Sequence, residues 1–222
     1  MNPDLIIFDC DGVLIDSEII ACRVDAEALT ALGIPMSTED VIGKFAGVSQ
    51  ADMRVTIENE TGRTLPHDHE ANVAKRVKEV MSKELREIAG VRSTVEQIDI
   101  PFCIASSSTH QKLRFTLTHT GLFDLFEPNI FSSSEVAFGK PAPDLFLHAA
   151  SKMKTAPERC IVIEDSTAGV KAAVAAGMQP IGFVGGAHCD DNHTERLQHA
   201  GAPIVIDRFE DLLKTVPTAF CS

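Results

Sequence analysis

Acidic residues follow two short apolar segments of the sequence, and their types suit metal-assisted chemistry. They are Asp9 and Asp11 after Leu5–Phe8, and Glu164 and Asp165 after Ile161–Ile163. Carboxylates gathered in one cleft repel one another unless a cation neutralises them, and hard oxygen ligands suit Mg²⁺. With a cation bound, one of the Asp9/Asp11 pair could serve as the nucleophile of a hydrolysis.

Hydroxyl groups and a lysine complete a set that suits a phosphate ester. A second apolar segment ends in Ser106, Ser107 and Ser108, and Lys140 lies in the segment GKPAPD. A phosphate dianion repels nucleophiles, so its hydrolysis needs neutralised charge and an attacking group held in line. Lys140, Ser106 and backbone N–H groups near Gly12 could neutralise that charge. Ser107 is a further candidate phosphate ligand, although Ser107 and Ser108 equally suit a turn and a helix cap.

The apolar segments themselves predict parallel strands that bring these groups together. Unbroken hydrophobic runs separated by helical patterns are typical of strands covered on both faces by helices. Ligands of such open sheets bind beyond the carboxyl ends of the strands. We therefore expect an α/β fold with a doubly wound, mostly parallel, Rossmann-like sheet. The predicted strands are Leu5–Phe8, Phe102–Ala105, Ile161–Ile163, Ile181–Val184 and Ile204–Ile206, and the predicted helices between them include His110–Thr120, Asp144–Met153 and Thr167–Ala176.

One stretch interrupts this alternation of strands and helices. Between the first and second predicted strands the pattern is helical only, with apolar residues such as Ile20 and Val24 one turn apart. Ser49 and Asp52 resemble a capping box that opens another helix. We expect a catalytic core made of residues 1–16 and 87–222, and an inserted small α-helical cap of residues 17–86 over the working edge of the sheet.

Composition and charge exclude several classes of protein. The net charge of -12 argues against a nucleic-acid partner, which would require a basic stripe. No apolar run approaches the roughly 20 residues of a membrane span, and the N-terminus lacks the features of a signal peptide. The six cysteines are scattered without a C-x-x-C pair, which favours reduced thiols in a cytosol. We expect a cytoplasmic monomer that binds neither nucleic acid nor membrane.

The four groups of residues together resemble a known family. FDCDGVLIDS at residues 8–17 looks like the first motif of the haloacid dehalogenase-like hydrolases. Ser106, Lys140 within GKPAPD, and EDS at residues 164–166 match the other three motifs in order. The match extends over the whole chain and is most similar to the branch that contains β-phosphoglucomutase and small sugar phosphatases. It implies a Mg²⁺-dependent phosphatase of a small phosphorylated metabolite such as a sugar phosphate.

The resemblance also implies a role for each matching residue. Asp9 attacks phosphorus and becomes an aspartyl phosphate. Asp11 protonates the leaving oxygen and then deprotonates the water that hydrolyses the intermediate. Ser106 donates to the phosphoryl oxygens, and Lys140 links the phosphate to the nucleophile as a point charge. The implied Mg²⁺ ligands are Asp9, Asp11 through its backbone carbonyl, Glu164 and Asp165.

The predicted cap departs from the mutase pattern. The mutase has a histidine where this chain has Ala21, a lysine at Ala46 and an arginine at Gln50. Because those mutase residues manage the proton transfer and hold a second phosphate, their replacement by small or neutral residues favours water as the acceptor. The alternatives are a β-phosphoglucomutase-like phosphosugar mutase and a non-catalytic phosphometabolite-binding protein, and the presence of Asp11 argues against the latter.

A separate group of potential metal ligands follows a predicted strand. His188, Cys189, Asp190, Asp191 and His193 have donor types that bind zinc or another transition metal. They are crowded into six residues without a usual structural spacing, so we expect a solvated loop beside the active-site mouth. Whether the His188–His193 loop binds a second metal is a question that the sequence leaves open.

Overall fold

The computed structural model describes residues 2–45 and 48–220, which divide into two compact units. One unit comprises Met1–Asp16 together with Arg86–Ser222, and the other comprises Ser17–Leu85. The chain leaves the first unit after the first strand and returns to it before the second strand. The placement of the helical unit over the edge of the sheet stays a prediction.

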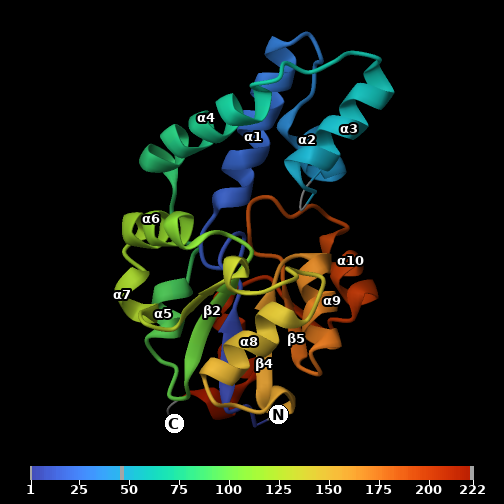
Figure 1. The fold of residues 1–222 in the computed structure, drawn as a ribbon. Coiled ribbons are helices and arrows are strands. Elements are labelled where there is room, and N and C mark those ends of the chain that lie inside the picture. The colour runs from blue at the N-terminus through green and yellow to red at the C-terminus, as the bar shows by residue number, and fades with distance from the viewer. Residues whose placement is uncertain (1, 46–47, 221–222) are drawn as a thin grey trace. The chain divides into compact units, whose positions relative to one another are not determined.

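The larger unit is built on a six-stranded sheet whose paired strands are all parallel (Figure 1). The strand order is β3-β2-β1-β4-β5-β6. Because the order reverses at β1, the sheet is doubly wound, and the predicted fold class is confirmed. The strands are β1 (Leu5–Phe8), β2 (Phe102–Ser106), β3 (Ile130–Ser132), β4 (Cys160–Glu164), β5 (Gln179–Phe183) and β6 (Ile204–Ile206).

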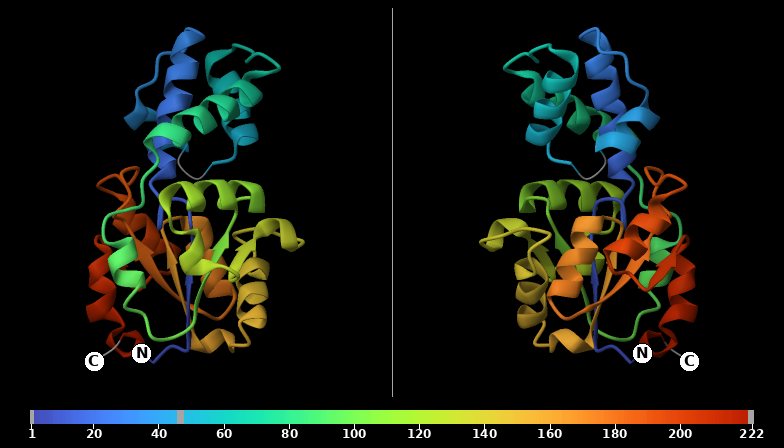
Figure 2. Two further views of the ribbon diagram at one scale, coloured as in Figure 1. Left: turned by 90° about the vertical axis from the view of Figure 1, so that its left-hand side faces the viewer. Right: turned by 90° about the vertical axis from the view of Figure 1, so that its right-hand side faces the viewer.

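Helices cover both faces of this sheet (Figure 2). Successive residues of β1 point to opposite faces: Ile7 packs with α8 and α9, whereas Phe8 stacks on Phe209 and meets Phe126 edge-on. Both β1 residues are fully buried, which explains why the strands are continuous hydrophobic runs. The α-helices are α5 (Val91–Val95), α6 (His110–Thr120), α7 (Phe123–Phe126), α8 (Asp144–Lys152), α9 (Thr167–Ala175), α10 (His193–Ala200) and α11 (Leu212–Thr215). The 3₁₀ helices are η1 (Ser133–Glu135), η2 (Pro157–Arg159), η3 (Phe209–Asp211) and η4 (Pro217–Ala219).

The smaller unit consists of helices only within its described residues. They are α1 (Ser17–Ala31), α2 (Thr38–Phe45), α3 (Gln50–Thr61) and α4 (His69–Glu84). Its core is an apolar cluster that includes Leu29 of α1 and Ile57 of α3. Ser49 caps α3 by accepting from the backbone N–H of Asp52, as the sequence predicts. Ala46 lies outside the described residues.

The sequence missed one strand, the edge strand β3. This strand has three residues, and only Ile130 and Phe131 are apolar, so it gives no periodic signal. No helix in the described part of the chain is long and apolar enough to cross a membrane. The thiols of Cys10, Cys22, Cys103, Cys160 and Cys189 are free, whereas Cys221 lies outside the described residues.

Candidate active site

A buried ion triad occupies the carboxyl ends of β1 and β4. Asp9 follows β1 directly, and its backbone N–H donates to the carbonyl of Ile163 at 3.0 Å, which fixes it beside β4. Lys140, from the loop before α8, donates from Nζ to Asp9 Oδ1 and to Glu164 Oε1, both at 2.5 Å. All three side chains are less than 10% exposed. Residues from three distant parts of the sequence therefore meet at this end of the sheet.

Burial and charge oppose each other in this triad. Burial raises the pKa of Asp9 well above its ordinary range, and the Lys140 ammonium opposes that shift. Burial also raises the pKa of Glu164, again against the effect of Lys140. For Lys140 itself, burial lowers the pKa, but the charges of the two carboxylates outweigh it and the net shift is upward. The lysine is therefore held as a cation between two carboxylates.

Asp11 has two partners that sequence reasoning missed. Ser108 Oγ donates to Asp11 Oδ2 at 2.5 Å, and Lys112 Nζ lies 3.0 Å from Asp11 Oδ1. Ser108 belongs to the loop after β2, and Lys112 lies in the first turn of α6. The signal for Ser108 is its place after a strand. Lys112 had no such signal, because only the direction of α6 brings its side chain to Asp11.

The serines after β2 differ in their surroundings. Ser106 is 1% exposed, and its hydroxyl oxygen accepts from the backbone N–H of Ser108 at 3.1 Å. Ser107 is exposed, and its carbonyl accepts from the hydroxyl of Ser133. The expectation that Ser107 or Ser108 caps the following helix is wrong, because Thr109 is the N-cap of α6 and accepts from the N–H of Lys112.

Two histidines and a glycine surround Asp165. His188 Nε2 lies 2.9 Å from Asp165 Oδ2, and His193 Nε2 donates to the backbone carbonyl of Asp165 at 2.6 Å. Gly12 has a φ of +81°, and a Cβ built on it would lie 2.1 Å from Asp165 Oδ2. Only glycine allows the turn after β1 to approach that carboxylate so closely.

The His188–His193 segment is the predicted solvated loop only in part, because Asp191 and Asn192 are exposed whereas both histidines are buried. His188 is 3% exposed and His193 is 7% exposed. Burial lowers the pKa of His188, but hydrogen bonds to Asp165 and Cys189 raise it to about 11. Burial raises the pKa of the Cys189 thiol, but hydrogen bonds from His188 and His193 outweigh it, so the net shift is downward. The two histidines are buried because they contact Asp165, and sequence patterns do not show these contacts.

The donor set fits a hard divalent cation. Asp9, Glu164 and Asp165 are buried carboxylates, and the charges of Glu164, Asp165 and Asp11 each raise the pKa of Asp9. These carboxylates therefore repel one another, although Lys140 lies between Asp9 and Glu164. Carboxylate and carbonyl oxygens without soft donors are the ligands that Mg²⁺ prefers. Glu164 is already engaged, because Oε1 binds Lys140 and Oε2 accepts from the N–H and hydroxyl of Ser166.

The helical unit has no cation at the position where the mutase pattern places an arginine. Gln50 Nε2 donates to Asp25 Oδ1 at 3.2 Å and to Asp25 Oδ2 at 3.0 Å. Asp25 is 5% exposed and Ala21 lies one turn before it in α1. Gln50 therefore satisfies a buried carboxylate of its own unit.

The chain is similar to known hydrolases over most of its length. Residues 3–177 match the haloacid dehalogenase-like hydrolase family. The 6-phosphogluconate phosphatase of Escherichia coli (strain K12) is 30% identical over 201 residues, which cover 88% of this chain and 87% of that protein. A phosphorylated carbohydrates phosphatase of Thermotoga maritima is 29% identical over 80% of this chain and 83% of its own length. The crystal structure of a haloacid dehalogenase-like protein of unknown function from Agrobacterium tumefaciens has a TM-score of 0.93 and 39% identity, covering 96% of this chain and 97% of that one.

Proposed function

Because the chain belongs to the haloacid dehalogenase-like hydrolases and is a phosphoric monoester hydrolase, we propose that it is a Mg²⁺-dependent phosphatase acting through Asp9. The substrate is a small phosphorylated metabolite, with a sugar phosphate as the first candidate. The observation that carries the proposal is the buried contact of Lys140 with both Asp9 and Glu164 at the carboxyl ends of β1 and β4.

The surroundings of Asp9 suit a nucleophile. Lys140 binds its Oδ1, and among the described residues Oδ2 has no hydrogen-bond partner. Oδ2 can therefore attack phosphorus while Lys140 holds the carboxylate in one orientation. The attack forms an O–P bond to Asp9 and breaks the bond to the leaving oxygen. Lys140 and the Ser106 hydroxyl lie at the same end of the sheet and can bind the phosphoryl oxygens.

Asp9, Asp165 and the Asp11 backbone carbonyl would hold the Mg²⁺, with Glu164 as a fourth ligand that also binds Lys140. When bound, the ion would neutralise charge on the phosphoryl group and on the surrounding carboxylates. Gly12 contributes by leaving space for the Asp165 carboxylate, as its close approach indicates. His188 and His193 contribute by fixing the side chain and the carbonyl of Asp165.

Asp11 is the candidate proton donor and acceptor. It stands two residues after the nucleophile, on the turn that Gly12 permits. Ser108 and Lys112 each bind one of its carboxylate oxygens, so its orientation is fixed. Asp11 would protonate the leaving oxygen as the ester bond breaks. It would then take a proton from the water that releases phosphate from Asp9.

A sugar phosphate is the first substrate candidate because relatives over most of the chain are named for phosphorylated carbohydrates. Water rather than a second sugar is the acceptor in this proposal. The support is that neutral Gln50 binds Asp25, where the mutase pattern has an arginine for a second phosphate. The substrate is tested by measuring phosphate release from several dozen phosphorylated metabolites. Isomerised sugar phosphate without phosphate release would instead indicate a mutase.

The mechanism is tested with p-nitrophenyl phosphate in the presence of Mg²⁺. The wild-type chain should release nitrophenol, and Asp9→Asn should abolish the release because the amide is a poor nucleophile. A matched control is Asp4→Asn, one residue before the same strand, where Asp4 forms an exposed pair with Arg159. Asp4→Asn should keep its activity. Equal turnover by Asp9→Asn and the wild type would refute the role of Asp9.

A further inference from the structure

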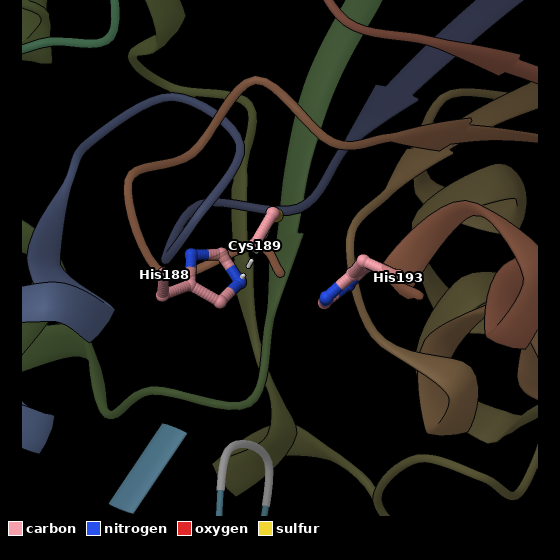
Figure 3. Close-up of side chains that lie close together, drawn as sticks. All are labelled: His188, Cys189 and His193. Carbon is pink, nitrogen blue, oxygen red and sulfur yellow. Dashed lines mark hydrogen bonds between the residues drawn. The ribbon is translucent and has the colours of Figure 1, made fainter. Parts of the chain in front are cut away.

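A second cluster of donors lies beside the candidate active site and has a different chemistry. Ligand atoms of His188, Cys189 and His193 all lie within 4.8 Å of one another. Figure 3 shows the His188 and Cys189 side chains together, with His193 facing them from the start of α10. We propose that these three residues form a binding site for a thiophilic divalent cation such as Zn²⁺, and that its occupancy loosens Asp165.

The donor types select the cation. Two imidazoles and one thiolate are the soft and borderline ligands that zinc and other late transition metals prefer. The carboxylate set of Asp9, Glu164 and Asp165 instead suits Mg²⁺. Two adjacent sites with different preferences are therefore built into one end of the sheet. The same imidazoles favour the thiolate form of Cys189, which is the form that binds metal.

The burial of the cluster supports a defined site. His188 and His193 are both more than nine-tenths buried, and Cys189 is half-buried. Among the described residues, His188 Nδ1 has no hydrogen-bond partner, although it is buried. Nδ1 could therefore carry the ring proton when Nε2 binds an ion.

Metal binding and the support of Asp165 compete for the same nitrogen. His188 Nε2 faces the Cys189 sulfur at 3.7 Å and also lies 2.9 Å from Asp165 Oδ2. A nitrogen that donates its lone pair to a metal carries no proton for a carboxylate. A cation held by His188 and Cys189 therefore removes the hydrogen bond to Asp165. The thiol and imidazole protons are released to solvent as the ion binds.

His193 supports the backbone of Asp165, and metal binding would compete with that contact as well. Its Nε2 donates to the Asp165 carbonyl, and its Nδ1 accepts from Arg196 at 3.0 Å, because a guanidinium can only donate. A metal that binds either nitrogen must replace one of these hydrogen bonds. Since Asp165 is a proposed Mg²⁺ ligand, occupancy of the His188–Cys189–His193 site is expected to lower phosphatase activity.

The site is tested first by spectroscopy, which does not depend on turnover. Co²⁺ is added to the full-length protein after chelator treatment, with Mg²⁺ in excess to occupy the carboxylates. The wild type should develop a thiolate-to-cobalt charge-transfer band that saturates at one equivalent. Cys189→Ser should lack the band. Cys160→Ser is the matched control, because Cys160 is a buried free thiol at the amino end of β4, and it should keep the band.

An activity titration tests the link to Asp165. With Mg²⁺ in excess, Zn²⁺ should inhibit the wild type, and Cys189→Ser should need more than about tenfold more Zn²⁺, since even outer partners of metal ligands contribute that much. Cys189→Ser should keep its basal activity, which separates loss of the site from misfolding. A missing band in the wild type, or a band that persists in Cys189→Ser, would overturn the site. Equal Zn²⁺ inhibition of both proteins would overturn the coupling.

Discussion

Each unit of the molecule buries an aspartate, and the two are satisfied in different ways. Asp9 in the core and Asp25 in the helical unit are both about 5% exposed. Burial raises the pKa of each. Asp9 is paired with the Lys140 ammonium at a strand end, whereas Asp25 of α1 accepts two hydrogen bonds from the neutral amide of Gln50, the first residue of α3.

This difference shows that a buried carboxylate alone does not indicate catalysis. Asp25 lies among the helices of the smaller unit, and its hydrogen-bond partner Gln50 is neutral. The local structure of that unit therefore accounts for the burial of Asp25. Asp9 is one of several carboxylates that repel one another, and it shares Lys140 with Glu164. Charge that the protein does not neutralise is the feature that calls for a cation or a substrate. Substitution of the charged and polar partners in each unit tests this difference.

The largest effect is expected from removing the buried cation. Lys140→Met leaves Asp9 and Glu164 without their shared partner, and breaking a buried ion pair costs about 3–5 kcal/mol. Loss of a group that stabilises the reacting phosphoryl oxygens should also lower kcat about 100- to 1,000-fold. Urea unfolding in the presence of chelator measures the first effect, and p-nitrophenyl phosphate turnover with Mg²⁺ measures the second.

Lys44→Met is the matched change in the helical unit. Lys44 pairs with Glu60, and both side chains are at least 40% exposed. Exposed pairs contribute at most about 1 kcal/mol, so this variant should unfold close to the wild type and keep its activity. If the two lysine variants lost the same stability and activity, the contrast between the buried and exposed pairs would be wrong.

An intermediate effect is expected from two glycines that share a backbone conformation. Gly12 and Gly62 have φ values of +81° and +65°, so alanine should cost about 1–2 kcal/mol at each. A Cβ at Gly12 also meets Asp165 Oδ2 at 2.1 Å and His188 Cε1 at 2.9 Å, whereas Gly62 has nothing within 4 Å. Gly12→Ala should weaken Mg²⁺ activation about 10- to 100-fold, and Gly62→Ala should not change it. Equal Mg²⁺ dependence of the two variants would count against Gly12 as a support of Asp165.

The rule that links strand ends to ligand sites explains which parts of the site were predictable. Asp9, Ser106 and Glu164 lie at or directly after strands that the sequence shows clearly, so their convergence follows from the parallel sheet. Lys140 was predicted from its GKPAPD context, because no strand precedes it directly. The fold was predictable for the same reason: buried parallel strands are unbroken apolar runs.

The residues that support the site were not predictable from such patterns. Lys112 reaches Asp11 because of the direction of α6, and His188 and His193 reach Asp165 because a loop after β5 folds inward. These contacts depend on the path of a loop or on the reach of a long side chain. Local sequence sets neither, because tertiary packing selects among many loop paths of similar energy.

The smallest effect expected is a pH dependence of stability in the helical unit. Burial raises the pKa of Asp25 above 3.8, and hydrogen bonds from Gln50 and the charge of His69 oppose it incompletely. The folded state then holds this proton more tightly than the unfolded state. The contribution of Asp25 to stability therefore falls as the pH rises from 3.8 through the raised pKa of the folded state. Above that pKa its contribution is constant. Asp25→Asn should remove this fall, so the variant gains stability relative to the wild type as pH rises.

Asp40→Asn provides the opposite sign in the same unit. Two hydrogen bonds from Ser37 lower the pKa of Asp40 below 3.8. The one from the backbone N–H has the larger effect, and the one from the hydroxyl has the smaller. The stability that Asp40 contributes is fully present above the pKa of the unfolded state. It is lost as the pH falls through the lowered pKa of the folded state. Relative to the wild type, Asp40→Asn should therefore lose stability as pH rises, while Asp25→Asn gains it. Urea unfolding of both variants from acid to neutral pH measures the two slopes. Slopes of the same sign would show that the pKa values of the two aspartates are not shifted in opposite directions.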